Sequence, residues 1–139
     1  MLDVLAWIHI DDDRMLTVRS RGRDRLYLPG GKREPGEDDW TALSREVHEE
    51  LGVRLDRASV RELGVVEDVA HDQPDHVMVR MKCFTGAYRG AIRAAGEIDS
   101  IVYVSAQQRD LLAPACQRAL DLARRHGLLR PAAAEGGLG

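Results

Sequence analysis

The sequence predicts an α/β fold, an α/β/α sandwich with a mixed β-sheet. Apolar segments of strand length occupy residues 2–10 and 98–104, on either side of an amphipathic helical segment at residues 38–51. A second helical segment follows at residues 114–126. Strands that surround one central helix, with another helix after the last strand, predict a sheet covered on both faces.

The first thirty residues predict a hairpin, a loop and a short strand. The apolar run at residues 2–10 includes Trp7 and is typical of a buried strand. Three consecutive aspartates follow and indicate a turn. The other elements expected here are a second hairpin arm at residues 15–18, a basic loop at residues 19–25 and a short strand at residues 26–28 that ends at Pro29.

The central helix, residues 38–51, has signals at both ends. Asp38 and Asp39 place negative charge at its N-terminus, where the helix dipole favours it, and Gly52 follows its last residue. Its apolar residues recur at helical spacing and predict one buried face, formed by Trp40, Leu43, Val47 and Leu51.

Two longer strands are expected after this helix, at residues 59–70 and 75–87. Gln73 and Pro74 lie in the polar turn that joins them. A further strand is expected at residues 98–104. The remaining expectations are a helix with Ser105 as N-cap, a helix at residues 114–126 with proline in its first turn, and a loose tail at residues 132–139.

The chain has 139 residues, which predicts a single domain over residues 1–131. Its net charge of −3 argues against a nucleic acid polymer as partner, but small anionic substrates need only a few local cations. Cys83 and Cys116 stand in apolar or helical surroundings and are expected to be buried free thiols. No signal peptide and no membrane span is indicated, so we expect a cytoplasmic protein without a membrane partner.

Three acids of the central helix are spaced to share one side. Glu46, Glu49 and Glu50 are three and four residues apart, and Glu37 precedes the helix. Carboxylates so close repel one another unless a cation binds them, and Mg²⁺ or Mn²⁺ prefers such oxygen ligands. Arg45 can hold one carboxylate by a bidentate contact. Taken alone, the acids also fit a solvated helix face.

The whole pattern over residues 31–53 resembles the Nudix box of the Nudix hydrolase family, of the MutT-like kind. The box consists of glycine, five residues, glutamate, seven residues, Arg-Glu, an aliphatic residue, any residue, Glu-Glu, any residue, glycine and an aliphatic residue. The sequence supplies every position, with Gly31, Glu37, Arg45, Glu46, Val47, Glu49, Glu50, Gly52 and Val53. Such a match is strong, because seven fixed residue types coincide by chance at on the order of one start position in 10⁸.

The resemblance implies a metal site and a reaction. It implies Mg²⁺ or Mn²⁺ bound by Glu46, Glu49 and Glu50, joined by the carbonyl of Gly30. Glu37 then supports the site, either directly or through Arg45. The implied reaction is attack of metal-activated water on a phosphorus of a nucleoside diphosphate linked to another group.

The general base stays open between box glutamates and a later acid. Glu50 and Glu46 are the candidates inside the box, and Glu97, shortly before the strand at residues 98–104, resembles the later acid of MutT-type proteins. An exposed turn is the alternative reading for Glu97.

Arginines and aromatic residues upstream of the box are candidates for substrate binding. We favour Arg19, which ends an expected strand, over the other arginines of the basic loop, together with Tyr27 and Lys32. Trp7 and Tyr27 can each stack on a base or pack in the core. The polar segment at residues 71–76, which contains His71, Asp72 and His76, is expected to be a loop.

The expected substrate is a small nucleotide-like molecule, first a (deoxy)nucleoside triphosphate. ADP-ribose or a nucleotide sugar is the alternative. In this family, ADP-ribose hydrolases often carry a proline after the box, and dinucleoside polyphosphate hydrolases often carry a tyrosine there, but residues 67–70 have neither. A domain that senses a nucleotide without cleaving it is a rival of another class, and a diphosphate isomerase is a third. The oligomeric state is open, with a homodimer as one option.

Overall fold

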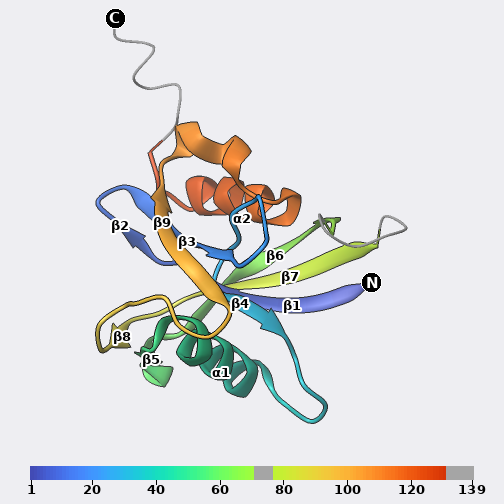
Figure 1. Ribbon diagram of the computed structural model, residues 1–139, viewed down its shortest axis with the longest axis vertical. Helices are drawn as coiled ribbons and strands as arrows, with labels where there is room; N and C mark the ends of the chain where they lie inside the picture. The colour runs from blue at the N-terminus through green and yellow to red at the C-terminus, as the bar shows by residue number, and fades with distance from the viewer. Residues whose placement is uncertain (71–76, 131–139) are drawn as a thin grey trace, which may run out of the picture.

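The computed structural model describes residues 1–70 and 77–130, in which the strands form three sheets (Figure 1). The largest sheet has the order β4-β1-β7-β6 and consists of Gly30–Lys32, Leu2–Trp7, Met78–Thr85 and Arg61–Val69. β1 and β7 are parallel, and the other two pairs are antiparallel. The second sheet joins β2 (Ile10–Asp11), β3 (Arg14–Ser20) and β9 (Ile98–Val104), and the third pairs β5 (Arg54–Leu55) with β8 (Tyr88–Arg89).

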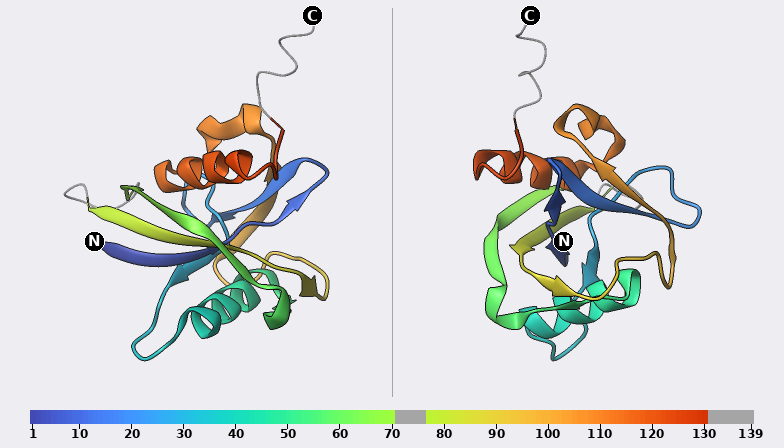
Figure 2. Two further views of the ribbon diagram at one scale, coloured as in Figure 1. Left: turned by 180° about the vertical axis from the view of Figure 1, so that it is seen from behind. Right: turned by 90° about the vertical axis from the view of Figure 1, so that its left-hand side faces the viewer.

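The two α-helices cover opposite sides of the strands (Figures 1 and 2). α1 (Asp39–Leu51) packs on one side, and α2 (Pro114–Arg125) packs on the other. Each helix closes its own apolar core: Leu43 of α1 is fully buried in one cluster, and Leu120 of α2 in the other. The predicted α/β/α sandwich with a mixed sheet is confirmed.

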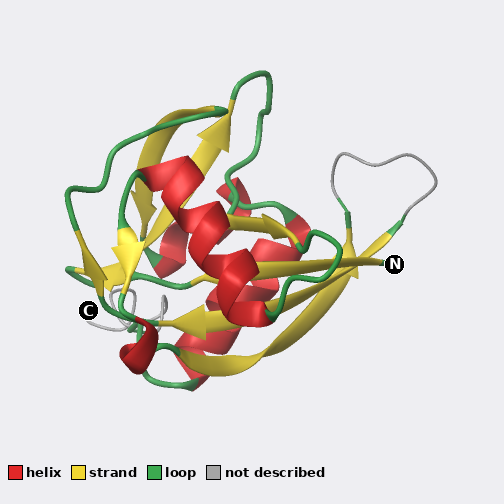
Figure 3. Cartoon of the chain, turned by 90° about the horizontal axis from the view of Figure 1, so that it is seen from below, coloured by secondary structure: helices red, strands yellow, loops and turns green. Residues whose placement is uncertain are grey.

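α1 begins and ends where its sequence signals predict. The carboxylate of Asp38 accepts a hydrogen bond from the backbone N–H of Thr41, at 2.8 Å, and so caps the first turn. Gly52 takes the left-handed conformation, with φ of 73°, and its N–H donates to the carbonyl of His48. Figure 3 shows α1 lying across the strands. Leu43, Val47 and Leu51 of this helix are buried.

The predicted hairpin and two other elements are confirmed. β2 and β3 pair across the aspartate turn, in which Asp12 and Asp13 both have positive φ. β9 has the predicted bounds, and α2 has proline at its first turn. After Ser105, the backbone forms a 3₁₀ helix, η3 (Ala106–Leu111), rather than an α-helix, and the N–H of Ser105 donates to the side chain of Gln108.

The prediction of a short strand at residues 26–28 differs from the structure, in which the strand lies at the glycines that follow this segment. Only isolated bridges join Leu26 and Tyr27 to neighbouring segments, and the strand lies further on, at β4. Gly30 has a φ of 146°, and a Cβ there would collide with the carbonyl of Leu5 on β1. Glycine therefore permits the close pairing of β4 with β1, although glycine usually weakens a strand.

The expected strand at residues 2–10 is divided into β1 and β2, and β6 and β7 are shorter than predicted. Sequence reasoning missed β5, β8 and the 3₁₀ helix η1 (Arg57–Ser59). The thiols of Cys83 and Cys116 are free and buried, as predicted. Within residues 1–70 and 77–130, none of the helices has the length and apolar character needed to cross a membrane. The expected loop with its Gln73–Pro74 turn and the tail at residues 132–139 lie outside the described residues.

Candidate functional site

The two glycines of β4 bring the acidic side of α1 against the sheet. The N–H of Gly30 donates a 3.0 Å hydrogen bond to Oε1 of Glu50. A Cβ on Gly31 would lie 2.5 Å from Oε2 of Glu46, so this second carboxylate occupies space that any larger residue would take. Glu46 and Glu50 therefore converge on the same short segment of backbone.

Arg45 holds the loop before α1 against the helix. Its Nε and Nη2 donate to the two carboxylate oxygens of Glu37, at 2.7 and 2.9 Å, which is a bidentate contact. Nη2 also donates to the carbonyl of Lys32 at 3.1 Å. Nη1 reaches Glu46 at 3.2 Å and Glu49 at 3.4 Å. One guanidinium therefore connects β4, the preceding loop and two acids of the helix.

Glu37 is held in its charged form by these contacts. Hydrogen bonds from Arg45, followed by the N–H of Glu34 at 2.8 Å, lower the pKa of Glu37 to about 2. The same contacts raise the pKa of the Arg45 guanidinium. Glu37 is therefore positioned to hold Arg45 in place, and not to accept a proton near neutral pH.

Glu50 has the opposite environment. Burial raises its pKa to about 8, and the charges of Glu46 and Glu49 add to that rise, while the hydrogen bond from Gly30 opposes it. Burial also raises the pKa of Glu46, although Arg45 opposes that rise. Two carboxylates that resist ionisation beside each other form a site in which a bound cation is strongly favoured.

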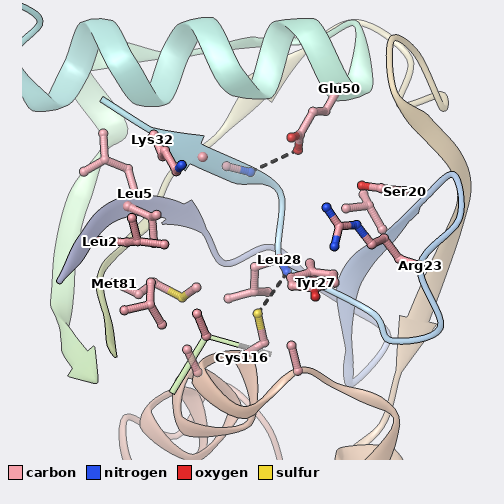
Figure 4. Close-up of a pocket in the computed structure, with 18 of the residues that line it drawn as sticks. Leu2, Leu5, Ser20, Arg23, Tyr27, Leu28, Lys32, Glu50, Met81 and Cys116 are labelled. Carbon is pink, nitrogen blue, oxygen red and sulfur yellow. Dashed lines mark hydrogen bonds between the residues drawn. The ribbon is translucent and has the colours of Figure 1, made fainter. Parts of the chain in front are cut away.

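Glu50 lies in the wall of a pocket of about 350 Å³ between α1 and α2 (Figure 4). This volume lies within the range typical of small-molecule sites, roughly 300–1,000 Å³. Leu2, Leu28 and Met81 give the pocket apolar surface, and Cys116 of α2 lines its other side, where its Sγ accepts a hydrogen bond from the N–H of Leu28. The pocket therefore has a charged end at α1 and an apolar end at α2.

Two of the three predicted substrate-binding residues, Tyr27 and Lys32, line this pocket. Arg19 is not among its lining residues; its Nε is buried and has no hydrogen-bond partner in the described part of the chain. Arg23 lines the pocket instead, with its guanidinium directed inward beside Tyr27 (Figure 4). Tyr27 bridges back to Val18, so the basic loop that carries Arg23 returns to the sheet, and no signal in the sequence separates Arg23 from the other arginines of this loop.

Trp7 and Glu97 lie away from the pocket wall. Trp7 is fully buried, and its indole N–H donates to the carbonyl of Gly86 at 3.1 Å, which favours core packing over base stacking. Glu97 is exposed, in a loop that contacts the end of α1: the N–H of Ala95 donates to the carbonyl of Glu50 at 2.9 Å. The loop thus brings the backbone before Glu97 close in space to the end of α1, while the side chain of Glu97 is exposed.

The donor set fits a hard divalent cation, because Glu46 and Glu50 bring carboxylate oxygens to the same short backbone segment at Gly30 and Gly31. Glu49 is more than half exposed and turned toward Arg45. Within residues 1–70 and 77–130, no three acidic, histidine or cysteine side chains are close enough together to hold an ion as they stand. A third carboxylate ligand therefore requires rotation of the Glu49 side chain.

A family comparison agrees with this fold. The model of the NUDIX domain matches residues 1–125, which is most of the chain. The chain therefore belongs to the NUDIX domain family.

Curated relatives of the chain include RNA pyrophosphohydrolases. The protein of that name from Bradyrhizobium diazoefficiens is 40% identical over 100 residues, which is 67% of this chain and 50% of the relative. The one from Rhodopseudomonas palustris (strain BisB18) is 40% identical over 85 residues, 56% of this chain and 45% of the relative. The chain thus spans about half the length of the curated relatives it matches.

Solved structures show the same fold over nearly the whole chain. The E. coli ORF135 protein has a TM-score of 0.69 and 26% identity, with 95% of this chain and 94% of that chain covered. The MutT NUDIX hydrolase from Burkholderia pseudomallei has a TM-score of 0.70 and 23% identity, with 87% and 96% covered. At this level of identity, the second likeness concerns the fold alone.

Proposed function

We propose that the protein is a divalent-metal-dependent hydrolase that cleaves a pyrophosphate bond in a nucleotide-like substrate. The observation that carries the proposal is the position of Glu50, a carboxylate with a raised pKa, beside Glu46 at the charged end of a nucleotide-sized pocket. Membership of the NUDIX domain family and the names of the relatives support this activity.

In this proposal Glu46, Glu49, Glu50 and the carbonyl of Gly30 hold Mg²⁺ or Mn²⁺. The bound ion would neutralise the pyrophosphate, lower the pKa of water and orient the leaving group. Glu37 is assigned to the support of this site and not to direct ligation, because both its oxygens already accept hydrogen bonds from Arg45. Arg45 is then a positioning residue, since it reaches Glu46 and Glu49 while it is fixed by Glu37.

The base that takes a proton from the attacking water is assigned to a box glutamate. Glu50 is the first candidate, because its carboxylate lies in the pocket wall at the charged end. Glu46 is the second, and Glu97 the third, because the side chain of Glu97 is exposed.

The substrate class that we propose first is a (deoxy)nucleoside triphosphate. Its base fits the apolar end of the pocket, while Arg23 and Lys32 of the pocket wall supply positive charge for phosphate. The names of the relatives favour a second candidate, the triphosphate at the 5′ end of an RNA chain. ADP-ribose or a nucleotide sugar remains the alternative diphosphate substrate. A cytoplasmic location and a homodimer stay predictions from the sequence.

A substrate panel tests the proposal. The protein is incubated with Mg²⁺ and, in parallel, with EDTA, on nucleoside triphosphates, ADP-ribose, a nucleotide sugar and a 5′-triphosphorylated oligoribonucleotide. We expect phosphate or pyrophosphate release that requires the metal, on at least one nucleotide substrate. Nucleotide binding without any release would favour the non-catalytic sensing domain, although all the box acids that an enzyme needs are present.

A further inference from the structure

An unbalanced cluster of arginines lies beside the last turn of α1, outside the pocket. Arg54 of β5 and Arg89 of β8 are direct partners across an antiparallel strand pair, so their side chains share one face. The next pair, Leu55 and Tyr88, belongs to the apolar core or packs against it, so the arginine pair faces solvent. Like charges directly opposite each other destabilise such a pair.

Arg93 completes this arginine cluster, which consists of Arg54, Arg89 and Arg93. A Cβ on Gly52 would lie 3.1 Å from the guanidinium carbon of Arg93, so that group rests against the residue that ends α1. All three arginines are exposed. Figure 1 shows β5 and β8 side by side next to α1.

Nearby carboxylates do not neutralise the cluster. Asp56 accepts a hydrogen bond from the N–H of Ala58, and Glu49 is turned toward Arg45. Among the residues that the structure describes, Arg54, Arg89 and Arg93 form no ion pair, whereas Arg45 and Arg109 both do. In a chain with a net charge of −3, three adjacent unpaired arginines suit an external anion.

The cluster is joined directly to the candidate metal site. The N–H of Arg93 donates to the carbonyl of Leu51 at 3.1 Å, and the N–H of Ala95 donates to the carbonyl of Glu50 at 2.9 Å. The segment that carries Arg93 therefore runs along the turn whose Glu50 side chain enters the pocket. An anion on the cluster would therefore lie beside the turn of α1 that also carries Glu50.

We propose that the arginine cluster binds the phosphate backbone of a single-stranded RNA whose 5′ polyphosphate occupies the site at Glu50. This inference rests on the proposed function and selects the RNA 5′ end over the free nucleotide as the preferred substrate. A footprint of three arginines is compatible with the acidic net charge, because each contact neutralises one phosphate and no large basic face is required.

Equilibrium binding tests the cluster independently of turnover. The probe is a fluorescein-labelled, 5′-triphosphorylated 12-mer oligoribonucleotide, measured by anisotropy with Mg²⁺ in the E50Q background, where cleavage is suppressed. R54Q/R89Q removes the facing pair, and R93Q is measured separately because Arg93 also packs on Gly52. The matched control is R14Q/R125Q, which removes the same charge from two exposed arginines on β3 and α2.

The expected result is weaker binding of the 12-mer by R54Q/R89Q than by the control, and a shallower salt dependence. Each single-strand phosphate contact contributes a log–log slope of about −0.7, so two lost contacts change the slope by about 1.4. Raising salt from about 50 to about 200 mM should then weaken binding by the control about sevenfold more than binding by the variant. Binding of labelled ATP should be equal in both.

Equal affinity and equal salt slope for the 12-mer in R54Q/R89Q and R14Q/R125Q would overturn the proposal. The hydrolysis panel is separate: absence of metal-dependent release from every substrate would refute the proposed function, while the binding result would still decide the role of the arginine cluster.

Discussion

Glu37 lies just before α1 and Glu50 lies in its last turn. Both are glutamates, but their surroundings differ in charge and burial. At the start, Arg45 binds both oxygens of Glu37 and lowers its pKa to about 2. At the end, Glu50 faces a pocket, receives a single N–H from Gly30 and has a pKa of about 8. The first environment suits a structural ion pair, and the second suits a group that changes its charge when a cation or a proton binds.

The Glu50→Gln substitution should have the largest effect. It removes both a ligand charge and a base candidate, so metal-dependent kcat should fall on the order of 10²–10⁴-fold. The helix should remain folded, because the substitution removes one of several like charges. Steady-state kinetics measure kcat, and circular dichroism checks that the variant is folded. Turnover near the wild-type level would exclude Glu50 from the chemistry.

Arg45→Lys should have a smaller effect on turnover. Lysine keeps the charge but cannot make the bidentate contact with Glu37, so Glu46 and Glu49 lose a fixed neighbour. Loss of such supporting contacts typically costs about 10–100-fold in metal affinity or activity. Titration with Mn²⁺ measures the loss of metal affinity, and activity at saturating metal measures the loss of turnover. A variant with normal metal affinity and normal turnover would contradict a positioning role.

Glu97→Gln distinguishes a base in the later loop from a base in the box. Because Glu97 is exposed, we expect turnover within about threefold of wild type, the range of a surface change of about 0.5 kcal/mol. The pH profile of kcat/KM should be unchanged. A fall as large as that of Glu50→Gln would move the general base to Glu97.

The smallest effects are expected on the stability of the metal-free protein, with opposite signs at the two ends. Glu50 has a pKa of about 8 when folded and a model-peptide value of 4.5, so the folded chain binds more protons between these pH values. Its contribution to stability therefore falls as pH rises from 4.5 to 8. For Glu37, with a folded pKa of about 2, the contribution is present above pH 4.5 and is lost as pH falls toward 2.

Thermal unfolding in EDTA at pH 5 and pH 8 measures this difference. Glu50→Gln should gain stability relative to wild type as pH rises, whereas Glu37→Gln should be less stable than wild type at both values. If Glu50→Gln does not gain stability relative to wild type between pH 5 and pH 8, the charged carboxylate of Glu50 is well solvated in the folded state, which contradicts this prediction.

Local sequence signals predicted the elements that carry them. Asp38 and Gly52 mark the ends of α1 because caps act through neighbouring backbone groups, and β9 was predicted at its observed bounds. β4 was missed because glycine disfavours strands in general, and only the three-dimensional pairing with Leu5 of β1 explains why Gly30 is needed there.

For the candidate site, the box positions predicted which acids come together but not their different environments. The spacing of Glu46, Glu49 and Glu50 indicates that they lie on one side of the helix. In the structure, however, Glu50 is half-buried and Glu49 is exposed. Arg23 could not be chosen among the upstream arginines, because its place in the pocket wall depends on how the loop returns through Tyr27.

A crystal soaked in Mn²⁺ tests the central claim most directly, because anomalous scattering locates the ion without reference to activity. The account predicts an ion bound by the carboxylates of Glu46 and Glu50 and the carbonyl of Gly30, with Glu49 turned inward and Arg45 still on Glu37. An ion bound elsewhere, or none at this place while both carboxylates point to solvent, would contradict it.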